Sequence, residues 1–142
     1  MKIPLGVAKQ AGLLSRVVAK AIDLIIIIAA AEILPKAGFL AGVVYMLIGD
    51  GIAGGGSLGK RLLGLAVIDG EGVPCRARES ILRNLPLGIG VLLWRVPIIG
   101  WLLAAVIFGM ESIVLLGSRE GKRIGDEIAK TRVIEARLKE AV

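Results

Sequence analysis

The longest apolar region of the sequence, residues 81–117, constrains the fold more than any other feature. As one helix, its 37 residues would extend about 55 Å, nearly twice the thickness of the hydrocarbon core of a bilayer. Prolines and glycines interrupt this region, and Arg95 stands two residues before Pro97 near its middle. We therefore expect two shorter helices, at about 81–95 and 98–117, joined by a turn.

Two further apolar runs lie in the N-terminal half of the chain. Residues 17–34 would form a helix of about 27 Å, and residues 38–53 follow after a short turn and end in a cluster of glycines. Hydrophobic residues make up 56% of the chain, and 20 of its 142 residues are glycine, which is typical of membrane proteins. The sequence therefore predicts an all-α membrane protein, a single domain over residues 1–142 with a four-transmembrane-helix bundle.

The basic residues predict the orientation of these helices. Sixteen of the 18 Lys and Arg residues fall into three segments, residues 1–20, 54–83 and 118–142. The other two, Lys36 and Arg95, lie in the two turns proposed between helices. Because basic loops stay on the cytoplasmic side, we expect a multi-pass protein of the inner (cell) membrane with both termini in the cytoplasm.

The N-terminus also allows a second interpretation, as a secretory signal peptide. It has a basic start, the apolar run LIIII and then the small residues Ala29-Ala30-Ala31, in the order that such peptides show. Asp23 would interrupt the apolar core of that peptide. We therefore favour a first membrane helix.

Residues 51–65, GIAGGGSLGKRLLGL, contain most of the P-loop signature that binds nucleotide phosphates. That loop needs a strand before it and a Ser or Thr after its lysine to hold magnesium. Here an apolar helix precedes the glycines, and Arg61 follows Lys60. We expect no nucleotide binding, but a flexible exit from the membrane with Lys60 and Arg61 at anionic lipid headgroups.

A small cytoplasmic β-hairpin is predicted at about residues 60–79, between the second and third membrane helices. Residues 62–69 are a β-type run, Gly70-Glu71-Gly72 is typical of a turn, and residues 73–78 can return as the partner strand. The segment TRVIE, residues 131–135, can add a third strand.

The composition argues against enzymatic chemistry. The chain has no His and a single cysteine, Cys75, without a recognisable base beside it in the sequence. We expect no enzymatic activity, no metal site and no cofactor. The net charge is +6, and 16 of the 18 basic residues lie in the segments assigned to the cytoplasmic side, so we expect lipid headgroups rather than nucleic acid as the partner.

Four segments carry a family resemblance: SRVVAKAIDLII, GGSLGKRLLGLAVIDGEGVP, LRNLP and GDEIAKTRVIE. Together they extend over about residues 14–136, and they resemble the RDD family of small bacterial and archaeal membrane proteins. That family is named for an Arg and an Asp in or near the first helix and a second Asp near the last, here Arg16, Asp23 and Asp126. Two residues depart from its common pattern, Leu58 and Lys130. The resemblance implies sodium-or-lithium/proton antiport, which has been attributed to some members.

The candidate functional residues are acids in or at the ends of the apolar runs, together with the basic residues near them. Four acids qualify: Asp23, Glu32, Asp50 and Glu111. An ionised group in lipid costs several kcal/mol, so such residues usually face the interior, form pairs or serve an ion pathway. Because Glu32 and Asp50 lie near the ends of their runs, we expect them to be solvated. Asp23 and Glu111 lie deeper and need another explanation.

Arg16, Lys20 and Asp23 share one helix face at spacings of three, four and seven residues. Two interpretations stay open. In the first, Asp23 is a proton or cation site tuned by the two basic residues and by Asp126 or Glu111. In the second, Arg16, Asp23 and Asp126 form an ion network that joins the first helix to the last.

We therefore predict a membrane protein that exchanges a monovalent cation for a proton through intramembrane carboxylates. The alternative is a non-catalytic scaffold or assembly subunit that binds a partner protein. Small residues line one side of the second helix, at Gly38, Gly42, Gly49 and Ala53. Such residues allow close packing within one chain or between chains, so we also expect a homo-oligomer or a membrane partner.

Overall fold

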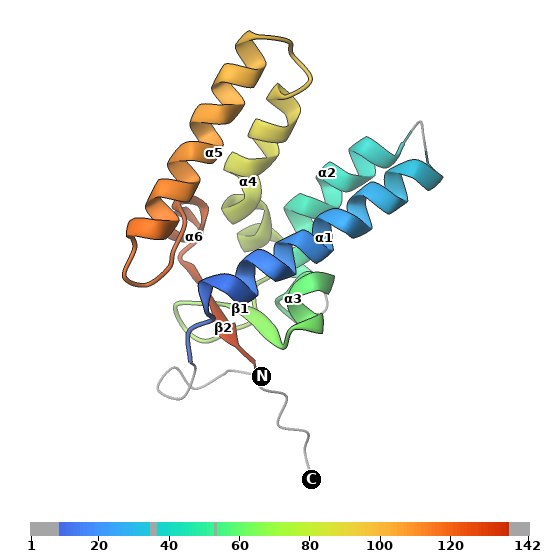
Figure 1. Cartoon of the computed structure of the whole chain (residues 1–142). Coiled ribbons are helices and arrows are strands. Elements are labelled where there is room, and N and C mark those ends of the chain that lie inside the picture. The colour runs from blue at the N-terminus through green and yellow to red at the C-terminus, as the bar shows by residue number, and fades with distance from the viewer. Residues whose placement is uncertain (1–8, 35–36, 53, 137–142) are drawn as a thin grey trace.

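The computed structural model describes residues 9–34, 37–52 and 54–136 (Figure 1). These residues are mostly helical, and they contain one small antiparallel sheet. In chain order the elements are α1 (Leu13–Ile33), α2 (Gly38–Ile48), the 3-10 helix η1 (Gly49–Gly51), α3 (Leu58–Leu62), β1 (Leu65–Asp69), α4 (Ala77–Leu93), α5 (Ile99–Gly117), α6 (Ile124–Ile128) and β2 (Thr131–Glu135). Each of the four apolar runs therefore forms a helix close to its predicted bounds.

The four long helices form two hairpins, α1 with α2 and α4 with α5, which diverge from a common base (Figure 1). The two hairpins meet where α2 packs on α4. The outer helices pack differently, because α1 lies against α3 and α5 lies against α6. The helices are therefore arranged as an open V, and the four-transmembrane-helix bundle stays a prediction.

Small residues on α2 pack within the chain. A Cβ added at Gly38 would overlap the backbone of Ala31, and one at Gly42 would contact the side chain of Ile27. Both neighbours belong to α1. This stripe therefore brings α1 and α2 close together, while Ala53 and the predicted turn at residues 35–36 lie outside the described residues.

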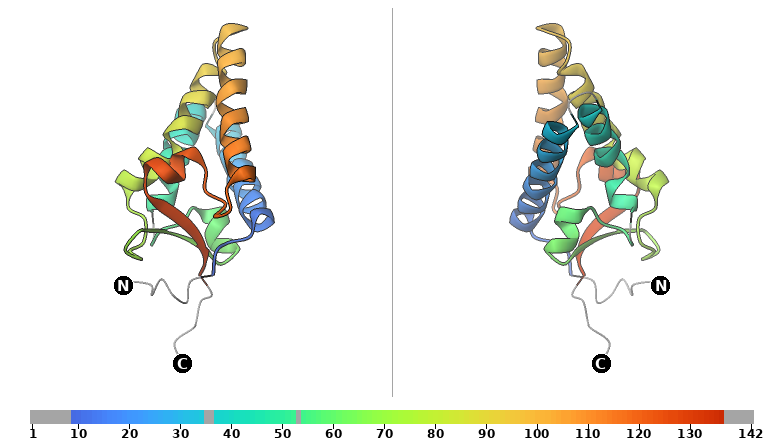
Figure 2. Two further views of the ribbon diagram at one scale, coloured as in Figure 1. Left: turned by 90° about the vertical axis from the view of Figure 1, so that its left-hand side faces the viewer. Right: turned by 90° about the vertical axis from the view of Figure 1, so that its right-hand side faces the viewer.

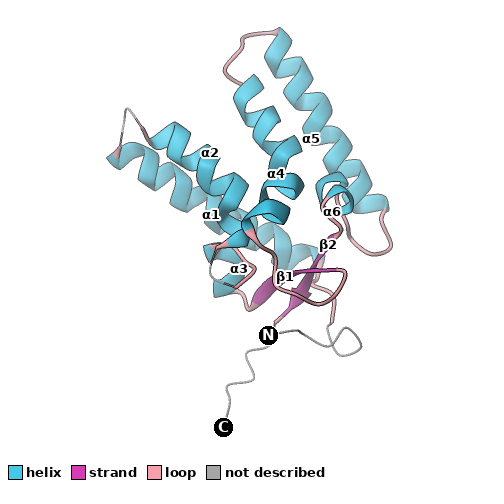
Figure 3. Cartoon of the chain, turned by 180° about the vertical axis from the view of Figure 1, so that it is seen from behind, coloured by secondary structure: helices cyan, strands magenta, loops and turns pink. Residues whose placement is uncertain are grey.

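The base contains β1, β2, α3 and α6, all at one end of the long helices (Figures 2 and 3). The strands pair in register from Leu65 opposite Glu135 to Asp69 opposite Thr131. A small apolar core lies beside them, formed by Ala11, Ala19, Leu65, Val67, Cys75 and Val133. The sheet thus joins the middle of the chain to its C-terminal part.

The predicted β-hairpin at 60–79 is confirmed in part, because residues 73–75 return antiparallel to β1, but the ladder partner of β1 is β2. Its first residues form α3, and the hydrogen-bonded partner of β1 is β2. Residues after the turn return alongside β1 with a bridge between Ile68 and Pro74. Asp69 N–H donates to the Val73 carbonyl over 2.9 Å, and Cys75 N–H donates to the Val67 carbonyl over 2.8 Å. Proline has no N–H group to donate, so it does not extend a ladder. The prediction of a strand at residues 131–135 is confirmed.

Among the described residues, α5 is the helix that is long and apolar enough to cross a membrane. It has 19 residues, with a mean hydropathy of 2.2 over its most apolar window. The apolar stretch Gly38–Gly51 is shorter, and α1 includes the charged residues Arg16, Lys20, Asp23 and Glu32. Four crossings therefore stay a prediction.

Replacing Gly125 by Ala tests how closely α6 packs on α4. A Cβ at this position would overlap the carbonyl oxygen of Arg83, so we expect Gly125→Ala to lower the free energy of unfolding by about 1–3 kcal/mol. The measurement is denaturant unfolding in detergent micelles. Gly109→Ala on α5 is the matched control, because a Cβ there meets nothing within 4 Å. Equal stability of the two variants would contradict this packing.

Candidate functional site

Arg83 of α4 is the centre of a buried ion network at the base of the helices. Its side chain has no exposed surface. Nη2 lies 2.6 Å from a carboxylate oxygen of Asp126, and Nε lies 3.5 Å from one of Asp50. Asp50 belongs to η1 at the end of α2, and Asp126 belongs to α6. One guanidinium therefore connects the first helical hairpin, the second hairpin and the C-terminal segment.

Asp50 is buried, with 3% of its surface exposed, and it has four partners. Lys60 Nζ lies 2.5 Å from Oδ1, and the Ser57 N–H donates to the same oxygen over 3.2 Å. Asn84 Nδ2 donates to Oδ2 over 3.3 Å, and Arg83 completes the set. The expectation that Asp50 is solvated is therefore wrong, because η1 turns its carboxylate into the network.

Lys60 is also placed differently from the sequence-based expectation. We expected it at lipid headgroups, but its side chain is 9% exposed and pairs with Asp50. Burial lowers the pKa of Lys60 to about 7, although the nearby Asp50 carboxylate acts in the opposite direction. The orientation follows from Gly59, where a Cβ would overlap the carbonyl oxygen of Ala19 in α1. This tight contact turns the next residue of α3 inward.

Asp126 gathers three arginines around one carboxylate. Arg16 Nη2 lies 2.8 Å from Oδ2, Arg83 contacts Oδ1, and Arg123 lies 3.8 Å from Oδ1. The backbone N–H of Arg123 donates to Oδ2 over 3.2 Å. Burial acts to raise the pKa of Asp126, but attraction to the three arginines outweighs it and lowers the pKa. Arg16 also donates to the Gly121 carbonyl, so α1 is joined to the C-terminal segment.

Asp23 lies apart from these arginines. Its carboxylate accepts hydrogen bonds from the Tyr45 hydroxyl (2.8 Å), the Ser57 hydroxyl (2.6 Å) and the Gly59 N–H (2.8 Å). The side chain is 3% exposed, and it forms no ion pair within the described part of the chain. The structure therefore joins Arg16 to Asp126 but places Asp23 among neutral donors on α2 and α3.

A small cavity lies beside Asp23. Its volume of about 10 Å³ is on the order of one water. Its walls are formed by Lys20, Asp23, Ile27, Tyr45, Met46, Gly49, Asp50 and Ser57. Two carboxylates, two hydroxyl groups and one ammonium group thus surround a space of the size of one water molecule.

Glu111 of α5 is buried on the other hairpin, with 3% of its surface exposed. Its Oε1 accepts a hydrogen bond from the Gly125 N–H over 3.2 Å. Its Oε2 has no hydrogen-bond partner in the described residues. Glu111 therefore belongs with α6 rather than with Asp23.

Sequence reasoning did not identify several residues of the network, namely Tyr45, Ser57, Arg83 and Asn84. One signal was present for the last two, because Arg83-Asn84 is a polar pair at the start of the apolar region 81–117. Tyr45 and Ser57 carried no such signal. They are recognisable once α2 and α3 are seen to pack around Asp23.

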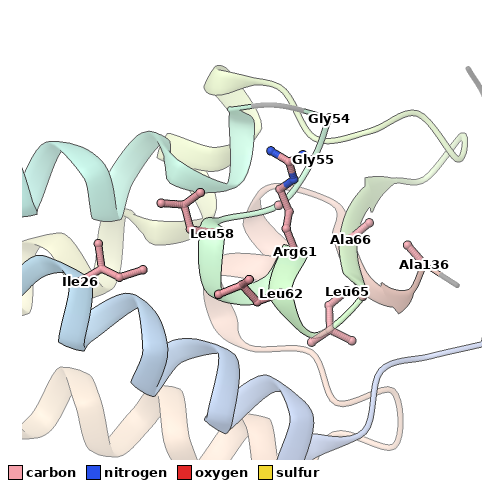
Figure 4. Close-up of a pocket in the computed structure, with 11 residues that line it drawn as sticks. Ile26, Gly54, Gly55, Leu58, Arg61, Leu62, Leu65, Ala66 and Ala136 are labelled. Carbon is pink, nitrogen blue, oxygen red and sulfur yellow. The ribbon is translucent and has the colours of Figure 1, made fainter. Parts of the chain in front are cut away.

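The largest cavity described, about 600 Å³, is a groove near α1, α3 and β1 (Figure 4). Arg61 is the charged residue among those that line it, and its exposed side chain has no ion pair or hydrogen bond to the described residues. Apolar and glycine residues form the remaining walls: Ile26, Gly54, Gly55, Gly56, Leu58, Leu62, Gly64, Leu65, Ala66 and Ala136. Contact of Arg61 with lipid headgroups stays a prediction.

A model of the RDD family matches residues 34–130, about two thirds of the chain. The chain belongs to the RDD family. The matched region includes Asp50, Arg83 and Asp126, while Arg16 and Asp23 precede it. No curated protein and no solved structure is significantly similar to the chain. Membership of this family, with the apolar helix α5, identifies a small membrane protein.

Removal of the charge at Asp126 tests the ion network. We expect Asp126→Asn to lower the free energy of unfolding by about 3–5 kcal/mol at pH 7, because Arg16 and Arg123 lose their carboxylate and Arg83 keeps only Asp50. Glu127→Gln is the matched control. The carboxylate of Glu127 is next to Asp126 in sequence but is exposed, so its removal should change the free energy of unfolding by less than about 0.5 kcal/mol. Equal losses would contradict the network.

The stability lost in Asp126→Asn should depend on pH. The folded-state pKa of Asp126 is lowered, so its stabilising contribution is present above its unfolded value of about 3.9 and is lost as the pH falls toward the folded value. The stability difference between wild type and Asp126→Asn should therefore be constant above about pH 5 and shrink below about pH 4. Thermal unfolding in micelles across this range measures it.

Proposed function

We propose that this RDD-family protein crosses the cell membrane four times, with its base and both termini in the cytoplasm. Apolar side chains cover the outer faces of the long helices, and large examples such as Leu102 and Ile113 are 66% and 72% exposed. Such surfaces suit lipid rather than water. At the turn between α4 and α5, far from the base, Trp94 and Trp101 are exposed, as is typical of a membrane interface.

We further propose that the protein exchanges a monovalent cation for a proton at Asp23. The observation that carries this proposal is the charge balance of the buried carboxylates. Asp50 and Asp126 each have cationic partners, whereas the three partners of Asp23 are neutral. An ionised carboxylate that is buried without an ion pair is costly. A bound proton or a small cation removes that cost.

The groups around Asp23 can serve both states of such a cycle. Hydroxyl groups donate and accept hydrogen bonds, so Ser57 and Tyr45 can donate to the ionised carboxylate and present oxygen atoms to a cation. The adjacent cavity has room for one water molecule or one small cation. Lys20 lines the same cavity, and its ammonium group competes with an incoming cation. Exchange of this kind uses these oxygen atoms and needs no resident metal ion or cofactor.

Lipid headgroups and a second copy of the chain are the partners that we propose. Arg61, at the apolar groove of Figure 4, is available to an anionic headgroup. Gly109 and Gly117 of α5 have open space where a side chain would lie, which permits close approach of another helix. These open positions also favour the alternative function, a scaffold that binds a membrane partner through α5.

Ion exchange in proteoliposomes tests the role of Asp23. With a pH-sensitive dye inside and a proton gradient imposed, sodium, lithium or potassium is added outside. We expect cation-dependent recovery of fluorescence in wild type and its loss in Asp23→Asn, because the variant keeps the shape and loses the titrating charge. Glu32→Gln is the control, since it removes an exposed carboxylate from the same helix.

Two results would count against exchange at Asp23. One is equal activity of wild type and Asp23→Asn. The other is an absence of cation-dependent signal in all three proteins, with insertion and orientation demonstrated. In the second case the scaffold function would be favoured over exchange. It would be tested by asking whether a membrane partner co-purifies with the protein and whether that binding requires α5.

A further inference from the structure

A cavity of about 140 Å³ lies between α1 and α5, separate from the small cavity beside Asp23. Its lining residues come from α1, α3, α4, α5 and the residue that precedes α6. They are Arg16, Val17, Lys20, Lys60, Arg83, Leu115 and Arg123. Five of these seven side chains are cationic and the other two are apolar. The cavity is therefore strongly positive, and it lies between the two outer helices of the open V.

The cations around this cavity outnumber the carboxylates that pair with them. Arg16, Arg83 and Arg123 share Asp126, while Lys60 and Arg83 share Asp50. Lys20 forms no ion pair within the described residues. Two carboxylates thus serve four cations, and the fifth, Lys20, lies beside Asp23 and Asp50 at the small cavity without an ion pair to either. A buried surplus of positive charge is costly, and a bound anion would remove it.

Arg83 supplies a donor without a partner. It is fully buried, and its Nη1 has neither a hydrogen bond nor an ion pair with any described residue. The Nε of Arg123 is also without a hydrogen-bond partner among them. Guanidinium groups hold phosphate oxygens through paired N–H donors. The donors left free are therefore of the kind that binds a tetrahedral oxyanion.

We propose that this cavity binds a phosphate group. The volume of about 140 Å³ equals that of several waters in the liquid, which is room for a phosphate but not for a nucleotide. The group is either inorganic phosphate from the cytoplasm or the phosphomonoester headgroup of an anionic lipid that enters between α1 and α5. This site does not rest on the proposed cation exchange: Lys20 lines both cavities, but the arginines argued to hold the phosphate do not contact Asp23.

Binding is measured with the full chain in nanodiscs of phosphatidylcholine. Inorganic phosphate is titrated against chloride at matched ionic strength, and the melting temperature and the phosphorus-31 line width are followed. We expect a saturable rise in melting temperature, with half-saturation at least tenfold weaker in Arg123→Gln. Arg78→Gln, which removes an exposed charge from the first turn of α4, should bind phosphate as wild type does.

A second set of nanodiscs contains phosphatidic acid and distinguishes the two sources. If the lipid supplies the phosphate, these nanodiscs raise the melting temperature of wild type but not of Arg123→Gln, and added inorganic phosphate has no effect in either lipid. If free phosphate is the ligand, the response to it persists in both lipids. Leu115→Trp fills the cavity without removing charge and should weaken either response, which keeps the test valid if Arg123→Gln does not fold.

The proposal is overturned if neither phosphate nor phosphatidic acid raises the melting temperature above that in chloride. It is also overturned if Arg78→Gln loses the response as fully as Arg123→Gln. Phosphate would then be attracted by the overall positive charge of the protein and not by this cavity. Loss of cation exchange in Asp23→Asn would not affect either result. The phosphate proposal and the exchange proposal can therefore be rejected separately.

Discussion

The charge of Arg83 has to be balanced inside the protein, and the remaining structure depends on how this is done. The side chain has no exposed surface and lies between Asp50 and Asp126, so the loss of hydration is offset only while both carboxylates stay in place. Asp50 lies at the end of the first helical hairpin, and Asp126 belongs to α6. Because Arg83 itself belongs to the second hairpin, this single group joins three parts of the chain that are distant in sequence.

The three buried aspartates consequently fall into two groups, while Glu111 accepts a hydrogen bond from α6. Asp50 and Asp126 are neutralised by lysine or arginine, and they hold α3, α4, α6 and the start of α1 at the base. Asp23 has neutral donors and a cavity of its own beside it. The first group holds the base together, and the second is the one on which the proposed exchange rests. This division leaves Asp23 outside the ion pairs that join the elements of the base.

Hydropathy and prolines were enough to place the four long helices, because those elements depend on local sequence. The pairing of Arg16 with Asp126 agrees with the family resemblance and with the predicted network between the first helix and the end of the chain. Lys60 and Arg61 were indistinguishable by sequence, since adjacent basic residues suggest the same headgroup contact, and only the packing of Gly59 on Ala19 turns one of them inward. The pairing of β1 with β2 spans more than 60 residues, and no local pattern predicts such a contact. Arg83 likewise meets its partners across 33 and 43 residues of sequence.

The measurement that tests this account most directly is a double-mutant cycle on the two carboxylates that share Arg83. Unfolding free energies are determined in detergent micelles for wild type, Asp50→Asn, Asp126→Asn and the double variant. If both carboxylates act through one guanidinium, their effects are coupled, and we expect an interaction energy of about 0.5–3 kcal/mol. Effects that add to within about 0.3 kcal/mol would show that the carboxylates act independently, and would contradict the role given to Arg83.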